Sequence, residues 1–351
     1  MGGPVVPRHS KLVIKLRTLN QIITMILLIT GGAGFIGSHL AEALLGQGHK
    51  VICIDNLDEY IYSSSLKREN IALLSVYSAF RFIEADIRDK NLLRQIMIRF
   101  GCDAVIHLAA YAGVRPSVQD PEKFMDVNVN GTLAVLEAMR GANVRKLLFA
   151  SSSSVYGNTS KSVFQENDAA DQPISPYAAS KRAAELLIYS YHALYGIDAT
   201  CLRLFTVYGP RQRPEMAIRK FVKRVMSGQL IDLYGDGNTY RNYTYVTDAV
   251  QGFMKALEKL GGYRVYNIGG QKAANLNEVI EIIESLTGMQ SQVAYKPEQA
   301  GDMRHTAADI SKAREYLDYE PLVTLETGIG QVIEWLAYKA EEEPLFQRLI
   351  Q

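Results

Sequence analysis

Short apolar segments alternate with amphipathic stretches along the first part of the chain, beginning at Met25. Each apolar segment has the length of a buried strand, and each stretch between them has helical spacing. The predicted strands are 26–30, 51–54, 81–86, 104–110, 146–151 and 199–205, and the predicted helices lie near 35–47, 66–77, 90–99, 121–140 and 176–195. Strands that are apolar on both faces and alternate with helices predict a parallel sheet covered on both sides. We therefore expect an α/β protein with a Rossmann-type, doubly wound domain over residues 25–203.

The pattern changes after residue 203. Turn-forming residues crowd the segments 208–214 and 234–243, and predicted helices lie near 215–227 and 325–339. We expect residues 204–340 to form mainly a smaller substrate-binding region, and 341–351 a C-terminal tail. The segment VYNIGG at 265–270 is typical of a buried strand, so part of the stretch from about 241 to 270 could rejoin the main sheet.

Residues 1–24 carry several cations and no acidic side chain, and they precede a second methionine, Met25, at the first predicted strand. We interpret them as an N-terminal extension, either a tag or an upstream start. No functional prediction depends on them.

Charge and composition narrow the class of ligand. The 38 Lys and Arg residues almost balance the 37 Asp and Glu residues, so no overall basic field favours nucleic acid or anionic lipid. No apolar run reaches the roughly 18 residues that a membrane span needs, and we expect a cytoplasmic protein. Cys53, Cys102 and Cys201 lack metal-ligand spacing, which predicts buried thiols and no metal. A small soluble ligand is the expected partner.

A glycine-rich turn follows the first predicted strand. Gly31, Gly34 and Gly37 open the first helix, where glycine lets the backbone approach a pyrophosphate and the helix N-terminus offers N–H groups to it. Asp55 ends the second strand 24 residues after Gly31, where its carboxylate can accept hydrogen bonds from ribose hydroxyls. A carboxylate there repels a 2′-phosphate, and no arginine follows within ten residues, so NAD is favoured over NADP. Further cofactor contacts are expected at Phe35, Ile36, Asn56, Asp86, Ile87, Leu108, Ala109 and Ala110.

The candidate chemistry lies in a second pair of motifs. Tyr177 and Lys181 are four residues apart on one predicted helix, so both side chains lie on the same face. A phenol with a pKa near 10 is a poor base at neutral pH unless a nearby cation favours the phenolate. Ser152, at the end of the fifth strand, supplies a hydroxyl that can polarise the same substrate oxygen.

Together these motifs resemble the extended short-chain dehydrogenase/reductase family, over nearly the whole chain from Met25. The resemblance implies that Tyr177 removes the proton from a sugar hydroxyl while NAD takes the hydride. It also implies that Lys181 lowers the pKa of the tyrosine and holds the nicotinamide ribose, while Ser152 hydrogen-bonds the reacting oxygen.

The fifth strand also indicates which reaction to expect. Family members that dehydrate sugars resemble S-T-D-E-V-Y-G there, with an Asp-Glu pair for acid and base work, whereas this chain has Ser152-Ser153-Ser154-Val155-Tyr156-Gly157. The missing carboxylates argue against a 4,6-dehydratase. Oxidation to a 4-keto sugar followed by reduction on its other face, a 4-epimerisation, remains.

The segment from Leu204 to Met216 resembles the F-T-V-Y-G-P-R-Q-R-P-D-M segment of UDP-glucuronate 4-epimerases. The resemblance implies that Thr206, with Ser153 and Ser154, forms a hydroxyl-lined pocket for the C6 carboxylate, where related decarboxylases carry asparagine in place of Thr206. The predicted reaction is conversion of UDP-glucuronate to UDP-galacturonate. Alternatives are a UDP-glucose/UDP-galactose or N-acetylhexosamine 4-epimerase, a UDP-glucuronate decarboxylase, or a non-catalytic NAD-binding protein.

Other substrate and assembly predictions follow from the same resemblance. Arg213, Arg241 and Arg304 match positions facing the nucleotide or its phosphates, although Asn242 stands where the family usually has aspartate. Asn128 is expected near the substrate, mainly as a positioning residue, and we interpret His107 as packed rather than catalytic. The helices near 121–140 and 176–195 are expected to pair in a homodimer.

Overall fold

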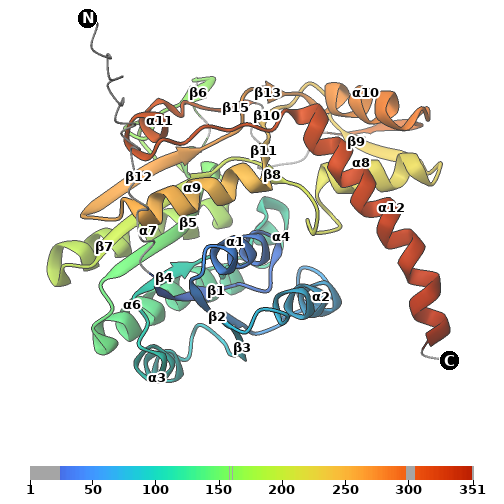
Figure 1. Cartoon of the computed structure of the whole chain (residues 1–351). Coiled ribbons are helices and arrows are strands. Elements are labelled where there is room, and N and C mark those ends of the chain that lie inside the picture. The colour runs from blue at the N-terminus through green and yellow to red at the C-terminus, as the bar shows by residue number, and fades with distance from the viewer. Residues whose placement is uncertain (1–23, 158, 160, 298–304, 350–351) are drawn as a thin grey trace, which may run out of the picture.

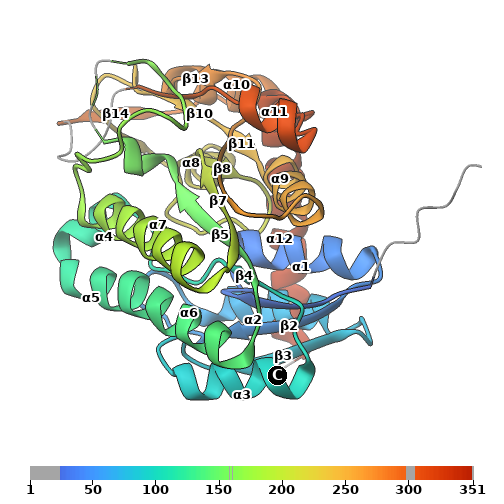
Figure 2. The ribbon, with the colours of Figure 1, turned by 90° about the vertical axis from the view of Figure 1, so that its left-hand side faces the viewer.

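A seven-stranded parallel sheet forms the centre of the protein (Figures 1 and 2). The computed structural model describes residues 24–157, 159, 161–297 and 305–349. The strand order is β12-β7-β5-β4-β1-β2-β3. The strands are β1 (Ile26–Thr30), β2 (Lys50–Asp55), β3 (Phe80–Glu84), β4 (Ala104–His107), β5 (Lys146–Ser152), β7 (Asp198–Leu204) and β12 (Tyr263–Ile268). The predicted Rossmann-type α/β fold is confirmed.

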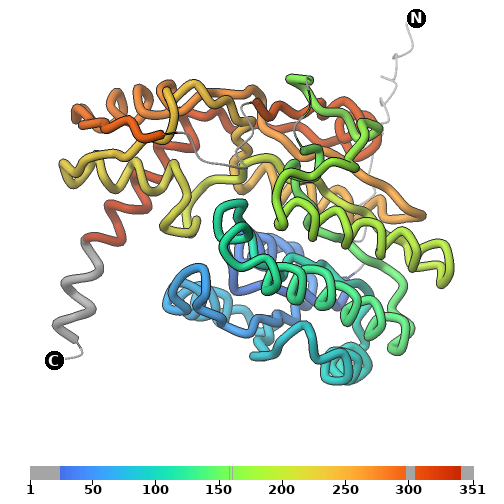
Figure 3. The backbone as a smooth tube through the Cα atoms, turned by 180° about the vertical axis from the view of Figure 1, so that it is seen from behind, coloured from blue at the N-terminus to red at the C-terminus, as the bar shows by residue number. Residues whose placement is uncertain are grey.

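Helices cover both faces of this sheet because its strands are apolar on both sides. Leu27 and Ile29 pack into one hydrophobic cluster and Leu28 into another, as alternation along a strand requires. The first face carries α1 (Phe35–Gly46), α2 (Ser64–Leu74) and α9 (Val246–Glu258), and the second carries α3 (Lys90–Phe100), α6 (Gly131–Ala142) and α7 (Pro176–Tyr195). Figure 3 shows α6 and α7 side by side across the second face.

The predicted helix over 121–140 is interrupted. It consists of α5 (Pro121–Met125), a π-helical turn at Asp126–Asn130, and α6, and it is preceded by α4 (Val114–Gln119). A π turn occurs as a single turn inside an otherwise α-helical stretch, and the α-helical periodicity on either side of it predicted one continuous helix. The turn directs Asn128 into the protein interior, where its side chain is 2% exposed.

Two strands each pair with a sheet of the other region. The segment that could rejoin the sheet does so, because β12 pairs in parallel with β7 from Tyr263–Ala199 to Ile268–Leu204. In the opposite direction, β6 (Val163–Phe164) leaves the first part of the chain and pairs with β15 (His305–Ala308). The two regions are therefore interleaved in the chain rather than consecutive.

The C-terminal region contains small sheets and four helices among the described residues. One sheet has the order β13-β10-β15-β6, and two-stranded sheets join β8 to β11 and β9 to β14. Its remaining elements are β8 (Val207–Tyr208), β9 (Ile231–Tyr234), β10 (Tyr240–Asn242), β11 (Thr244–Tyr245), β13 (Ala273–Ala274), β14 (Val293–Lys296), α8 (Ala217–Met226), α10 (Leu276–Thr287), α11 (Ser311–Leu317) and α12 (Leu325–Leu349).

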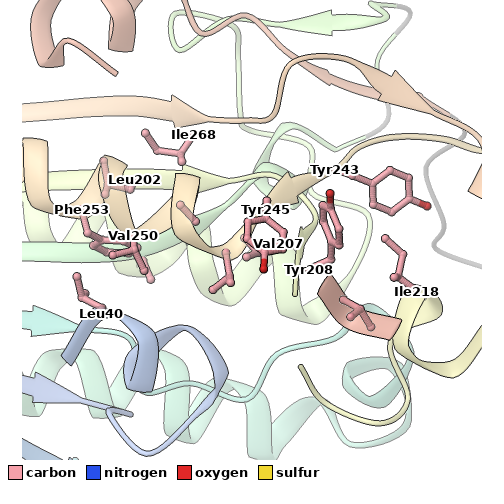
Figure 4. Close-up of a cluster of buried hydrophobic side chains, with 14 of the residues drawn as sticks. Leu40, Leu202, Val207, Tyr208, Ile218, Tyr243, Tyr245, Val250, Phe253 and Ile268 are labelled. Atoms are coloured by element: carbon pink, nitrogen blue, oxygen red, sulfur yellow. The ribbon is translucent and has the colours of Figure 1, made fainter. Parts of the chain in front are cut away.

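A continuous hydrophobic core joins the two regions. Leu40 of α1, Leu202 of β7 and Phe253 of α9 belong to the same cluster as Tyr208 and Ile218 of the C-terminal region (Figure 4). Because packed cores resist deformation, this cluster fixes the C-terminal region over the end of the main sheet. None of the described helices is both long and apolar enough to span a membrane.

Candidate active site

A cavity of about 1130 Å³ lies where the carboxyl ends of the main strands meet the C-terminal region. Ligands of doubly wound folds bind at this edge of the sheet, and the volume exceeds the roughly 300–1,000 Å³ of a typical single-ligand pocket. Most of the predicted site residues line it, namely Gly31, Gly34, Phe35, Ile36, Gly37, Asp55, Asn56, Asp86, Ile87, Leu108, Ala109, Ala110, Ser152, Ser153, Ser154, Tyr177, Lys181, Thr206, Arg213 and Arg241.

The glycine-rich turn has little room for larger side chains. Gly31 has φ of +70°, and a Cβ atom on it would lie 2.7 Å from the backbone nitrogen of Ala109. A Cβ atom on Gly37 would lie 2.3 Å from the carbonyl oxygen of Gly31. Gly34 precedes α1 and provides no side-chain cap, so N–H groups of the first helical turn stay available to an anion. The turn therefore fits a dinucleotide pyrophosphate.

Asp55 is held in place by a lysine that the sequence reasoning missed. Its Oδ1 accepts hydrogen bonds from the Lys67 ammonium at 3.1 Å and from the Leu57 backbone at 2.9 Å. Lys67 also donates to the Asp58 carbonyl and lines the cavity. Lys67 follows Asp55 by twelve residues, within α2, and belongs to no motif that indicates a cofactor site.

Asp86 lies at the same end of the cavity in a bidentate pair with Arg88. The Arg88 side chain donates to both carboxylate oxygens, at 2.9 and 2.7 Å, and Asn56 donates at 3.0 Å. The hydrogen bonds from Arg88 lower the pKa of Asp86 to about 2. Its carboxylate is therefore a fixed, ionised acceptor at the cavity wall.

Ser152, Tyr177 and Lys181 converge from two neighbouring elements. Ser152 ends β5, while Tyr177 lies in the first turn of α7, whose start is fixed by Pro176 and by the Ser175 cap, which accepts from the Ala178 N–H at 3.2 Å. Lys181, one turn further along α7, donates to the Ala150 carbonyl at 2.8 Å. The three side chains therefore lie where the end of β5 meets α7.

Burial dominates the electrostatics of this trio. It raises the pKa of Tyr177, while the Ser152 hydroxyl and the Arg213 guanidinium act in the opposite direction. It also lowers the pKa of Lys181 to about 8, against the influence of the Glu185 carboxylate. In the protein without cofactor, Ser152 and Arg213 therefore lower the pKa of the Tyr177 phenol. The predicted influence of Lys181 on that pKa stays a prediction.

Hydroxyl groups gather on the neighbouring wall. A 3-10 turn at Ser153–Tyr156 follows β5, and Ser152 Oγ accepts from the Ser154 N–H at 3.2 Å. Thr206 lies between β7 and β8, where its carbonyl accepts from the Thr244 N–H at 2.9 Å. Ser153, Ser154 and Thr206 line the same cavity as Tyr177.

The predicted phosphate-facing arginines have different surroundings. Arg213 donates to the Ala112 carbonyl at 2.9 Å and pairs with Glu215 at 3.2 Å, and it acts electrostatically on Tyr177. Arg241 donates to the Tyr240 carbonyl at 2.9 Å and also lines the cavity. Arg304 lies outside the described residues.

Two further predicted positions lie behind the cavity wall. The Asn128 amide exchanges hydrogen bonds with both backbone groups of Tyr111, at 2.8 and 3.0 Å, and donates to Ser180 at 2.9 Å. Asn128 is not among the lining residues, its contacts fit the expected positioning role, and its predicted contact with substrate stays a prediction. His107 is buried between the hydroxyls of Thr30 at 2.7 Å and Thr132 at 3.0 Å, in agreement with a packed histidine.

Other lining residues carried no motif. They include Tyr62 and Tyr111, which come from loops after β2 and β4. Such positions depend on how loops fold over the sheet, and no spacing in the sequence indicates them. Gln212, inside the Leu204–Met216 segment, also lines the cavity, and its amide donates to the Val207 carbonyl at 2.9 Å.

No group of three or more His, Cys, Asp or Glu side chains that could hold a metal ion occurs in the part of the chain that the structure describes. Cys53, Cys102 and Cys201 are buried free thiols, as predicted.

Known proteins are similar to this chain in both sequence and fold. A UDP-glucuronate 4-epimerase of Thermodesulfobacterium geofontis is 42% identical over 309 residues, which cover 88% of this chain and 95% of the relative. The crystal structure of a UDP-glucuronic acid 4-epimerase from Bacillus cereus with UDP-glucuronic acid and NAD has a TM-score of 0.85 at 36% identity, covering 90% of this chain and 99% of that chain. A UDP-glucose 4-epimerase of Thermotoga maritima with UDP-glucose has a TM-score of 0.82 at 34% identity, covering 90% and 100%.

The region that matches a known family contains the glycine-rich turn, Ser152, Tyr177, Lys181 and Thr206. Residues 27–269 match the NAD dependent epimerase/dehydratase family. This confirms the family that the motifs predicted. The chain belongs to the NAD dependent epimerase/dehydratase family.

Proposed function

We propose that this protein catalyses the NAD-dependent 4-epimerisation of UDP-glucuronate to UDP-galacturonate. The observation that carries the proposal is that one cavity is lined by the dinucleotide turn, by Ser152, Tyr177 and Lys181, and by the hydroxyls of Ser153, Ser154 and Thr206. The related epimerase of Bacillus cereus, crystallised with UDP-glucuronic acid and NAD, supports the same assignment.

NAD fits the first part of this cavity. The Gly31–Gly37 turn and the uncapped start of α1 would hold the pyrophosphate, and Asp55, oriented by Lys67, would accept from the adenosine ribose hydroxyls. When bound, NAD supplies a hydride acceptor and its positive nicotinamide ring.

Tyr177 is the proposed base. Its phenolate would take the proton of the sugar 4-hydroxyl as the C4 hydrogen leaves as hydride, and the resulting phenol would return the proton when the hydride comes back on the other face. Ser152, whose hydroxyl acts on the phenol, donates to the same oxygen and stabilises its developing charge. Lys181 is held against the Ala150 carbonyl, where its ammonium favours the phenolate.

The C6 carboxylate is assigned to Ser153, Ser154 and Thr206. Neutral hydroxyl donors keep a carboxylate ionised, and a firm hold on it out of line with the breaking bond disfavours loss of carbon dioxide from the 4-keto sugar. Arg213 and Arg241 are proposed to contact the nucleotide or its phosphates, since both line the cavity and a guanidinium suits phosphate geometry.

The second candidate is a 4-epimerase of neutral UDP-hexoses. The fold similarity to the UDP-glucose 4-epimerase of Thermotoga maritima favours it. Such a substrate would place a neutral C6 group against Thr206.

Product analysis tests these assignments. We would incubate the purified protein separately with UDP-glucuronate, UDP-glucose and UDP-N-acetylglucosamine, without added cofactor, and follow products by proton NMR. We expect UDP-galacturonate alone, with no UDP-pentose. Conversion of only the neutral sugars would refute the uronate assignment and keep the epimerase, whereas a pentose product would indicate decarboxylation.

We also propose a cytoplasmic homodimer. Its interface would be the outer face of α6 and α7, which are packed together and expose Leu133, Leu186 and Tyr189. The free thiols are consistent with a reducing compartment.

A further inference from the structure

A buried charged cluster lies one helical turn beyond Lys181. Glu185 of α7 has no exposed surface, and Arg203 of β7 is 3% exposed. Burial of an ionised carboxylate is costly unless it is paired and fully hydrogen-bonded. Neither Glu185 nor Arg203 lines the cavity, so direct contact with substrate does not explain the pair, although Ser151 beside it does line the cavity.

The Glu185 carboxylate has hydrogen-bond partners on three elements. Its Oε1 accepts from Ser151 of β5 at 2.6 Å and from Arg203 Nε at 3.0 Å. Its Oε2 accepts from Arg203 Nη2 at 2.9 Å and from Arg182 at 3.0 Å. Burial alone would raise the pKa of Glu185, but the contacts with Arg203, Ser151 and Arg182 outweigh burial and hold it below its ordinary value.

Three consecutive residues of β5 are thereby connected to α7. The Ala150 carbonyl accepts from Lys181, and the Ser151 hydroxyl donates to Glu185. The hydroxyl of the next residue, Ser152, acts on Tyr177. The Ser151–Glu185 hydrogen bond lies at the same end of β5 as the Ala150–Lys181 and Ser152–Tyr177 contacts, between the two.

Glu185 is also the charged group that favours the protonated form of Lys181. From β4, His107 faces Lys181, and burial lowers the histidine pKa to about 3, so the ring is neutral. From β7, Cys201 faces it as a thiol whose pKa is raised by burial, and from β5 the Phe149 ring lies 4.8 Å from the ammonium. Arg182 and Arg203 pair with Glu185 and offset part of its charge.

We propose that Glu185 is a positioning residue, which fastens the end of β5 to α7 through Ser151 and supplies the negative charge that Lys181 faces inside the protein. This inference rests on the proposed function, because it assigns a support to the Lys181 and Ser152 of that mechanism.

The charge is tested by Glu185→Gln, which keeps the shape of the side chain. We would titrate the [ε-13C]lysine NMR signals of the NAD-bound protein, with Lys181→Met to assign the Lys181 signal. We expect the Lys181 midpoint to fall by about one pH unit, and turnover at pH 8, taken as a fraction of each protein's low-pH plateau, to be roughly fivefold lower than in the wild type. Glu185→Asp, which keeps the charge, should restore the midpoint. An unchanged midpoint and pH profile in folded Glu185→Gln would overturn the electrostatic role.

Glu185→Gln leaves the buried Arg203 without its ionic partner, which can prevent folding. In that case Glu185→Gln combined with Arg203→Met removes both buried charges. A smaller downward shift of the Lys181 midpoint is expected, because loss of the Arg203 charge offsets part of the loss of the Glu185 charge. An unchanged midpoint again contradicts the proposal.

The hydrogen bond is tested by Ser151→Ala, which keeps the Glu185 charge. We expect kcat to fall several-fold while the Lys181 midpoint stays unchanged, because the hydrogen bond that holds the strand end is lost and the Glu185 charge is kept. Wild-type kcat would exclude the fastening role. Since the lysine titration needs no substrate, a shifted Lys181 midpoint together with no turnover of UDP-glucuronate by the wild type would reject the proposed substrate and retain this inference.

Discussion

Tyr177 occupies an environment that opposes its proposed role. Burial raises the pKa of its phenol, and among the described residues the Ser152 hydroxyl and the Arg213 guanidinium reduce this effect. A base with a raised pKa needs further positive charge to ionise at neutral pH, which Lys181 and bound NAD would supply.

Removal of this phenol should stop catalysis without emptying the site. We predict that Tyr177→Phe lowers kcat by about tenfold or more, because the proton of the sugar hydroxyl then has no acceptor. NAD content, measured after acid release, should stay at the wild-type level. Tyr189→Phe, on the exposed side of the same helix, is the matched control. Wild-type turnover by Tyr177→Phe would refute the mechanism.

Thr206 is the residue on which substrate choice depends in our proposal. Thr206→Val keeps the side-chain shape and removes the donor to the C6 carboxylate. A hydrogen bond to a charged group contributes about 1.5–3 kcal/mol, so kcat/KM for UDP-glucuronate should fall by roughly tenfold or more. Any activity toward UDP-glucose serves as the internal control and should fall less. Equal losses for both sugars would contradict a carboxylate contact.

His107 links stability to pH. Burial, followed by the charge of Lys181, lowers the pKa of His107 from 6.5 to about 3, so the folded protein leaves it neutral while the unfolded chain protonates it. Unfolding free energy is therefore lost as pH falls from 6.5 toward 3, by about 2 kcal/mol at pH 5 from this group. Urea unfolding at pH 7 and pH 5 should show a smaller loss for His107→Gln than for the wild type. An identical loss in both proteins would exclude His107 as a source.

At the scale of elements, the turn between β1 and α1 has no room for larger side chains. A Cβ atom on Gly37 would meet the Gly31 carbonyl oxygen at 2.3 Å, whereas a Cβ atom on Gly46, at the other end of α1, would meet nothing within 4 Å. The backbone is therefore too crowded for a side chain at Gly37, whereas Gly46 of the same helix has room for one.

This difference gives a matched pair of variants. We predict that Gly37→Ala displaces the turn, abolishes most NAD retention and lowers the unfolding free energy by about 1–3 kcal/mol. Gly46→Ala should retain NAD and gain up to about 1 kcal/mol, because alanine favours the helix. Cofactor content and urea unfolding measure both effects. Full NAD retention by Gly37→Ala would show that the turn can relax.

At the scale of the whole molecule, α6 and α7 together expose an apolar surface. Leu133 of α6 is 38% exposed, while Leu186 and Tyr189 of α7 are 53% and 55% exposed. Exposed apolar side chains on two adjacent helices can form the self-complementary interface of a two-fold dimer.

Oligomeric state tests this surface. We predict that the wild type elutes from a sizing column as a dimer, and that Leu186→Glu combined with Leu133→Glu elutes as a monomer with its NAD retained. Leu322→Glu, at a more exposed leucine outside these helices, should remain dimeric. A monomeric wild type would remove the dimer proposal.

The amino-acid sequence alone predicted the parallel sheet, the glycine-rich turn and the Ser152, Tyr177 and Lys181 trio. These features depend on residues close together in the chain. Alternating apolar segments specify buried strands, glycine spacing specifies the turn, and a four-residue interval places Tyr177 and Lys181 on one helix face.

Tertiary structure decided the features that join distant segments. It placed β12 in the main sheet and β6 in the smaller one, paired Lys67 with Asp55, turned the Asn128 amide toward Tyr111, and gathered Glu185 and Arg203 behind Ser151 of the cavity wall. Each of these contacts depends on the packing of elements that lie far apart in sequence, or on a single inserted residue in a helix. Hydrophobic periodicity records which face of an element is buried, but not which partner buries it.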